Sequence, residues 1–118
     1  MTAQPNVSFA VGNARPSTIS SQSVENFFVD VTATMPDGST YDPSDDIVAF
    51  AFLPVGSVPE SGTSWTAGTW VTTGAGFTAL ILIGLTGFVL AAGEYCAFVM
   101  LVDDPEAPVL AAGLVTVY

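Results

Sequence analysis

The segment from Tyr95 to Val102 constrains the fold more than any other stretch, because it is typical of a strand with two apolar faces. Its eight consecutive residues include no glycine, proline or charged side chain. Successive side chains of a strand point to opposite sides, so one face starts with Tyr95 and the other with Cys96. Both faces are apolar, whereas a strand with one face in water alternates apolar and polar residues. The segment therefore predicts a strand that is covered on both sides.

A second apolar segment, Val109–Val117, follows after a short acidic connection. The connection, Asp103–Pro108, holds two prolines, which fix the backbone and remove hydrogen-bond donors. Two apolar segments joined by about six such residues predict a β-hairpin.

Ile47–Leu53 repeats the pattern of two apolar faces. In a small β-sandwich the second sheet covers one face of such a strand, and the other face needs a different neighbour. We expect that neighbour to be another protein chain. The candidate interface residues on these two strands are Phe50, Phe52, Phe98 and Met100.

About seven short apolar segments alternate with turn signals every 8 to 12 residues, as in a β-sandwich or barrel. Val24–Met35 is expected to be a strand with one wet face, since Val29 and Val31 alternate with polar residues. No segment has a helical period with end signals, so no long helix is predicted. Residues 24–118 are expected to form the sandwich, preceded by a polar N-terminal arm, or an edge strand plus loop, over residues 1–23.

The charge balance excludes several classes of partner. The 118 residues include eleven acids, no lysine, no histidine and a single arginine, Arg15, for a net charge of −10. Nucleic acids and anionic membranes attract basic surfaces, so neither is an expected partner. Solubility by self-repulsion, or binding to a basic protein, fits the charge better.

The composition also argues against an enzyme. Without histidine or lysine the usual general bases are missing, and no serine lies in a Gly-x-Ser-x-Gly motif. Cys96 is the only cysteine, so it forms no internal disulfide and is interpreted as a small buried apolar residue. No catalytic residue and no cofactor are predicted.

Acidic loops raise the alternative of a calcium site, because Ca²⁺ binds carboxylate and carbonyl oxygens. The weak candidates are Asp45, Asp46, Asp103 and Asp104, helped by Asp42 if the loops meet. No calcium-loop motif is present, and solvated turn residues are the ordinary explanation.

Two tryptophans five positions apart, Trp65 and Trp70, are further candidate interface residues. Exposed aromatic rings can hold a sugar ring or anchor a partner. An alternative function is therefore an immunoglobulin-like module that recognises a carbohydrate or host-surface ligand through these rings and the acidic loops. The opposing interpretation is that one ring packs in the core.

Val71–Gly93 lacks charged residues and is long enough to span a bilayer as a helix. Five glycines interrupt it, and no basic residue flanks it. Two apolar strands, Phe77–Ile83 and Phe88–Leu90, joined by a turn are the preferred interpretation, so no membrane association is expected. The N-terminus shows no secretory signal pattern, which suggests synthesis in the cytoplasm and use there or in an assembly.

Leu90–Tyr95 resembles the corner before the sixth strand of immunoglobulin-like domains. In those domains the hydroxyl of a tyrosine, here Tyr95, bonds to the backbone a few residues upstream. The disulfide-bonded subclass is excluded, because Ala97 stands where its cysteine would be. The resemblance implies an all-β, immunoglobulin-like β-sandwich.

The order of three motifs resembles small immunoglobulin-like virion proteins of tailed bacteriophages. The motifs are Asp42–Phe52, Trp65–Trp70 and Gly93–Val109. The resemblance implies a structural protein of the virion, made in the host cytoplasm and placed on the capsid surface or in the head–tail region. Its expected partners are other capsid or head–tail subunits, with the chain present as a homo-oligomer or in many copies.

Overall fold

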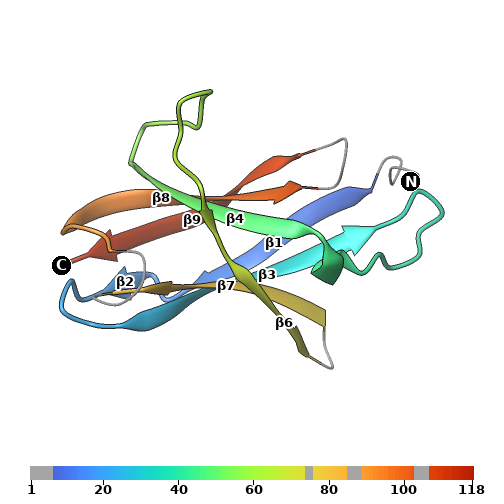
Figure 1. The fold of residues 1–118 in the computed structure, drawn as a ribbon, viewed down its shortest axis with the longest axis horizontal. Helices are drawn as coiled ribbons and strands as arrows, with labels where there is room; N and C mark the ends of the chain where they lie inside the picture. Colours follow the sequence, from blue (N-terminus) through green and yellow to red (C-terminus); the bar gives the residue numbers. More distant parts are fainter. Residues whose placement is uncertain (1–6, 74–75, 85–88, 103–106) are drawn as a thin grey trace.

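The computed structural model describes residues 7–73, 76–84, 89–102 and 107–118, and these residues form a two-layered β-structure (Figure 1). Within them the only helical element is a 3-10 turn, Pro43–Asp45 (η1). Two sheets lie face to face and enclose the apolar core between them.

The first sheet has four antiparallel strands, and the second has five. In spatial order the first sheet consists of β1 (Ser8–Arg15), β3 (Glu25–Thr34), β7 (Gly76–Ile83) and β6 (Thr69–Thr73). The second consists of β2 (Thr18–Ile19), β9 (Val109–Val117), β8 (Gly93–Val102), β4 (Ile47–Pro54) and β5 (Thr66–Ala67). Only the β2–β9 pair is parallel among the described pairs.

This order is that of an immunoglobulin-like sandwich. When the two-residue strands β2 and β5 are left aside, the first, second, fifth and fourth of the remaining strands (β1, β3, β7 and β6) form one sheet, and β4, β8 and β9 form the other. The prediction of an all-β sandwich without a long helix is confirmed for the described part of the chain. The described residues form nine strands, more than the expected seven or so. The additional ones include β2 and β5, which are only two residues long.

Strand alternation builds the core. Phe27, Val29 and Val31 of β3 are at most 2% exposed and point toward the second sheet, as their spacing predicts. The ring of Phe27 meets those of Phe50 and Phe52 edge-on, with centroids 6.2 and 5.2 Å apart. Complete burial of each such side chain stabilises the fold by about 1.5–3 kcal/mol.

The N-terminal segment belongs to both sheets. β1 pairs with β3 in the first sheet, and after Pro16 the chain enters the second sheet as β2. Ile19 is 1% exposed in the core, and its carbonyl accepts the N–H of Tyr118 at 3.0 Å. The expectation for residues 1–23 was a polar arm, or an edge strand plus loop. Within this range the structure has the strand β1 and the two-residue strand β2, which is too short to leave a periodic signal.

The apolar stretch Val71–Gly93 forms strands rather than a helix. β7 pairs with β3 on one side and with β6 on the other. The expected partner strand, Phe88–Leu90, is not found, since Val89 and Leu90 lie outside any strand and Phe88 lies outside the described residues. Among the described residues no helix is long and apolar enough to cross a membrane.

Tyr95 has the geometry of the expected corner. Its hydroxyl donates a hydrogen bond to the carbonyl oxygen of Ala91 at 2.6 Å. This bond spans the bend by which the chain enters β8. The side chain of Tyr95 also packs against the core.

Gly68 allows the chain to cross from β5 in the second sheet to β6 in the first. Its N–H donates to the carbonyl of Val48 at 2.8 Å. A Cβ atom at this position would lie 2.5 Å from Cε1 of Phe50 and 2.8 Å from the carbonyl oxygen of Leu80. Only glycine fits without displacing its neighbours.

Candidate interaction surface

The outer face of the second sheet is apolar over three neighbouring strands. In β8 the residues Ala97, Val99 and Leu101 are 0% exposed and belong to the core, so the alternate residues point outward. We define the apolar face as Ile47, Ala49, Ala51 and Leu53 of β4, Cys96, Phe98, Met100 and Val102 of β8, and Val109, Ala111 and Leu114 of β9.

The strand register aligns these side chains in continuous rows. Directly paired residues lie side by side on the same face of a sheet. Leu53, Cys96 and Leu114 form one row. Parallel to it run the rows Ala51–Phe98–Ala111 and Ala49–Met100–Val109. No charged or hydrogen-bonding polar side chain interrupts them.

A β-bulge in β9 decides which residues join this face. Ala97 pairs with Gly113 and Phe98 with Ala111, so Ala112 is an extra residue. The insertion reverses the alternation, which sends Val115 into the core and leaves Leu114 outside. Gly113 adopts a φ of 122°, which residues with a side chain disfavour, so a glycine at this position makes the bulge possible.

Exposure varies strongly across the apolar face. Ala49, Ala51 and Phe98 in its centre are at most 8% exposed. At its margins Ile47 is 62% exposed, Leu114 64% and Val109 43%. The margins therefore carry large apolar side chains that water still surrounds.

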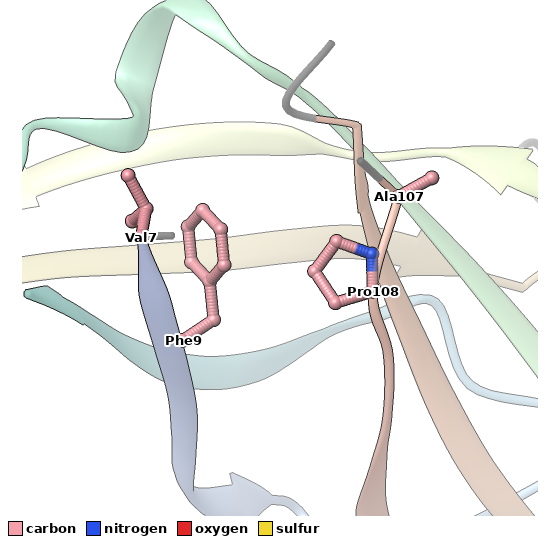
Figure 2. A pocket seen from close by; sticks show the side chains of 4 residues that line it. All are labelled: Val7, Phe9, Ala107 and Pro108. Carbon is pink, nitrogen blue, oxygen red and sulfur yellow. The ribbon is translucent and has the colours of Figure 1, made fainter. Parts of the chain in front are cut away.

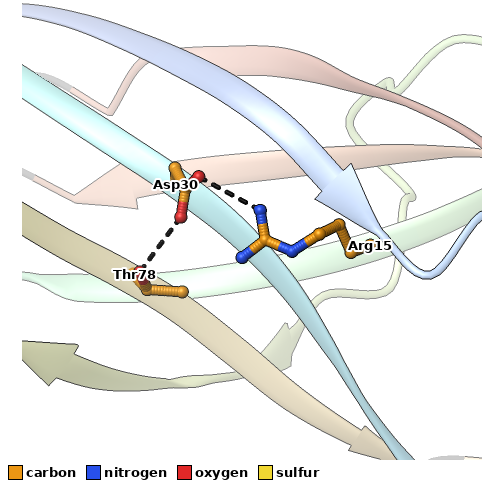
Figure 3. A network of polar contacts seen from close by, with 3 residues as sticks. All are labelled: Arg15, Asp30 and Thr78. Atoms are coloured by element: carbon orange, nitrogen blue, oxygen red, sulfur yellow. Dashed lines mark hydrogen bonds and ion pairs between the residues drawn. The ribbon is translucent and has the colours of Figure 1, made fainter.

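The outer face of the first sheet is different, because polar residues interrupt it. Arg15 of β1 donates to Asp30 of β3 through Nη1 at 3.2 Å, and the Thr78 hydroxyl of β7 donates to the same carboxylate at 3.1 Å (Figure 3). The Arg15 hydrogen bond lowers the pKa of Asp30, the Thr78 bond and the positive charge add to this, and partial desolvation opposes it.

The structure divides the predicted interface residues of the two strands. Phe98 and Met100 lie on the apolar face. Phe50 and Phe52 instead point inward, are 1% and 8% exposed, and pack against Phe27. They are core residues here, because the bulky side chains of β4 fill the space between the sheets.

Of the two tryptophans only Trp70 lies in a strand. Trp70 in β6 packs against the core, and its indole N–H donates to the carbonyl of Asp46 at 2.9 Å. Trp65 is half-buried and precedes β5. Trp70 therefore contributes to the fold.

The calcium candidates do not gather within the described residues. Asp46 accepts a hydrogen bond from the Tyr41 hydroxyl at 3.0 Å. Asp42 caps η1 by accepting from Ser44, which lowers the pKa of Asp42. The side chain of Asp45, like Asp103 and Asp104, lies outside the described residues. Across the described part of the chain, no three metal-binding side chains cluster.

One pocket of about 450 Å³ lies between the start of the chain and the β8–β9 connection (Figure 2). Its described lining consists of Val7, Phe9, Ala107 and Pro108. These side chains carry no group that could act as an acid, base, nucleophile or metal ligand. The described part of the lining therefore supplies no reactive group.

Comparison of the chain with protein-family models, with curated proteins and with solved structures finds no match. The fold and the apolar face are therefore the features that point to a function.

Proposed function

We propose that the chain is a non-enzymatic structural protein of a bacteriophage virion, in the capsid decoration or the head–tail connector region. It packs on other virion subunits through the apolar face. The observation that supports this proposal is the set of uninterrupted apolar rows on the outside of a chain with eleven acidic residues.

The physical reason is the cost of leaving such a face in water. The largest contiguous apolar patch on a soluble monomer covers about 300–600 Å² and is often a functional contact site. Ile47, Val109 and Leu114 together expose large side chains that a partner would cover. Burial contributes about 25 cal/mol for each Å² of apolar surface removed from water.

The side-chain chemistry supports a structural rather than a catalytic role. The chain has no histidine or lysine, and the lone thiol of Cys96 lies in an apolar row between Leu53 and Leu114. The virion assignment adds the order of the motifs Asp42–Phe52, Trp65–Trp70 and Gly93–Val109, which resembles that of phage immunoglobulin-like proteins.

The test is assembly. The chain is produced together with the head and tail proteins encoded beside its gene, and the products are separated by sedimentation. The wild-type chain should sediment with a particle or subassembly. A double variant, Ile47→Asp with Leu114→Asp, should stay unbound while keeping the β-type circular dichroism of the wild type, because both side chains are exposed.

A control variant, Val58→Asp with Val71→Asp, adds the same charge at exposed residues outside the apolar face, since Val58 lies in the β4–β5 connection and Val71 in β6 of the first sheet. It should sediment like the wild type. Wild-type protein that remains unbound with every head and tail component would refute the proposal.

A further inference from the structure

We infer that the occupant of the apolar face is a different protein, whose contact surface is apolar at its centre and bordered by lysine or arginine, and is not a second copy of this chain. The inference rests on the proposed function and specifies the partner. It follows from the size of the face, the acid at one of its ends, the net charge and the position of the single cation.

The apolar rows alone are too small for a stable interface. From Cys96 to Val102 they run about 20 Å, and three strands are about 14 Å wide, so the rows cover roughly 300 Å² of sheet. A standard interface buries about 800 Å² on each partner. The partner must therefore also lie over the margin of the face.

One end of the face carries an acid that points the same way as the apolar rows. Glu94 of β8 is exposed and pairs with Thr116, one row beyond Cys96 and Leu114. At the opposite end Asp46 precedes Ile47, but its carboxylate accepts a hydrogen bond from the Tyr41 hydroxyl at 3.0 Å and alternates with the outward-pointing Ile47. A partner that covers the rows therefore approaches the Glu94 carboxylate at one end.

A second copy cannot neutralise this acid. Arg15 is the only arginine of a chain without lysine, and it lies on the outer face of the opposite sheet in an ion pair with Asp30. In a two-fold pair of apolar faces with like ends together Glu94 meets Glu94, and with opposite ends together Glu94 meets no cation. Each copy also carries a net charge of −10. A margin of lysine or arginine on another protein removes this repulsion.

The first test is self-association. Sedimentation equilibrium of the intact chain at neutral pH should show a monomer at both low and physiological salt. A wild-type dimer that the variant Ile47→Asp with Leu114→Asp abolishes would overturn the inference, because it would make the second copy the occupant.

The second test uses two synthetic peptides as probes. Both have leucine at alternate central positions, and one ends in lysine pairs where the other ends in glutamate pairs. By isothermal titration calorimetry the lysine peptide should bind at least about tenfold more tightly, and added salt should weaken it. Equal binding of the two peptides would overturn the inference.

Matched variants separate docking from general attraction between opposite charges. The variant Ile47→Asp with Leu114→Asp should bind the lysine peptide more weakly despite its added negative charge, whereas Val58→Asp with Val71→Asp should not. Glu94→Lys should weaken binding about threefold, and Glu60→Lys, in the exposed β4–β5 connection, should have a smaller effect. Equal effects of Glu94→Lys and Glu60→Lys would contradict the role of the margin.

The outcomes distinguish this inference from the proposed function. Self-association through the apolar face would overturn the inference but leave a docking role intact. Selective binding of the lysine peptide, with no binding to any virion component, would support the partner chemistry and refute the virion assignment.

Discussion

Tyr95 shows how a single hydroxyl can hold the entry to a strand. Its bond to the carbonyl of Ala91 spans the bend before β8, the central strand of the apolar face. Tyr95→Phe removes this bond and keeps the ring, so the free energy of unfolding should fall by about 1 kcal/mol. Urea denaturation measures the change.

The control for this prediction is Tyr118→Phe at the exposed chain end, which should change stability by less than about 0.5 kcal/mol. Equal effects of the two substitutions would mean that the Tyr95 hydroxyl does not stabilise the corner.

Asp30 makes a pH-dependent contribution to stability. Its pKa is lowered in the folded state, mainly by Arg15, so the contribution is present above the unfolded pKa of about 3.9 and is lost as pH falls through the folded pKa. Asp30→Asn should lower the free energy of unfolding by at most about 1 kcal/mol at pH 7, since the ion pair is exposed.

At low pH, below the lowered folded pKa of Asp30, this difference between wild type and Asp30→Asn should vanish. Denaturation at the two pH values measures it, and Glu60→Gln serves as the exposed control with little change at either pH. A difference of equal size at pH 7 and at low pH would contradict the assignment.

At the scale of elements, the long strands were predictable and their inward sides were only partly so. β3 alternates apolar and polar residues, and its buried side follows directly from the sequence. β4 and β8 are apolar on both sides, so periodicity indicates a strand without telling which side faces the core. This ambiguity explains why Phe50 and Phe52 were assigned to an interface while they lie between the sheets.

The outward position of Leu114 could not be predicted from the sequence, for a different reason. It depends on the bulge at Ala112 and Gly113, a single extra residue that reverses the alternation of β9. The short strands β2 and β5 were missed because two residues cannot show a period. Tertiary pairing, rather than local sequence, creates these features.

The two faces of the second sheet give a direct comparison of equal side chains. Leu101 on the inner face is 0% exposed, and Leu114 on the outer face is 64% exposed. Leu101→Ala should lower the free energy of unfolding by about 2–5 kcal/mol, because it leaves a cavity in the core. Leu114→Ala should change it by less than about 1 kcal/mol.

Chemical denaturation of both variants tests this assignment of faces. Similar losses for Leu101→Ala and Leu114→Ala would contradict it, since they would place both side chains in the core.

At the scale of the whole molecule, net charge keeps apolar faces apart. The calculated isoelectric point is about 4.1, so the repulsion between copies disappears near that pH. Light scattering should show reversible association there. The variant Ile47→Asp with Leu114→Asp should associate less at its own isoelectric point, because its face carries two added polar groups.

Circular dichroism under the same conditions should show an unchanged fold in both proteins, so that association is not a result of unfolding. Equal association of the variant and the wild type would mean that other surfaces drive it.

The N-terminal strands close both layers of the molecule. β1 lies along the margin of β3, while β2 lies along the end of β9 in the other layer. A chain that began after residue 23 would expose unpaired backbone N–H and C=O groups on both β3 and β9. Two exposed strand edges on one molecule can pair with strands of two other molecules, so such truncated chains are expected to assemble into open-ended fibres.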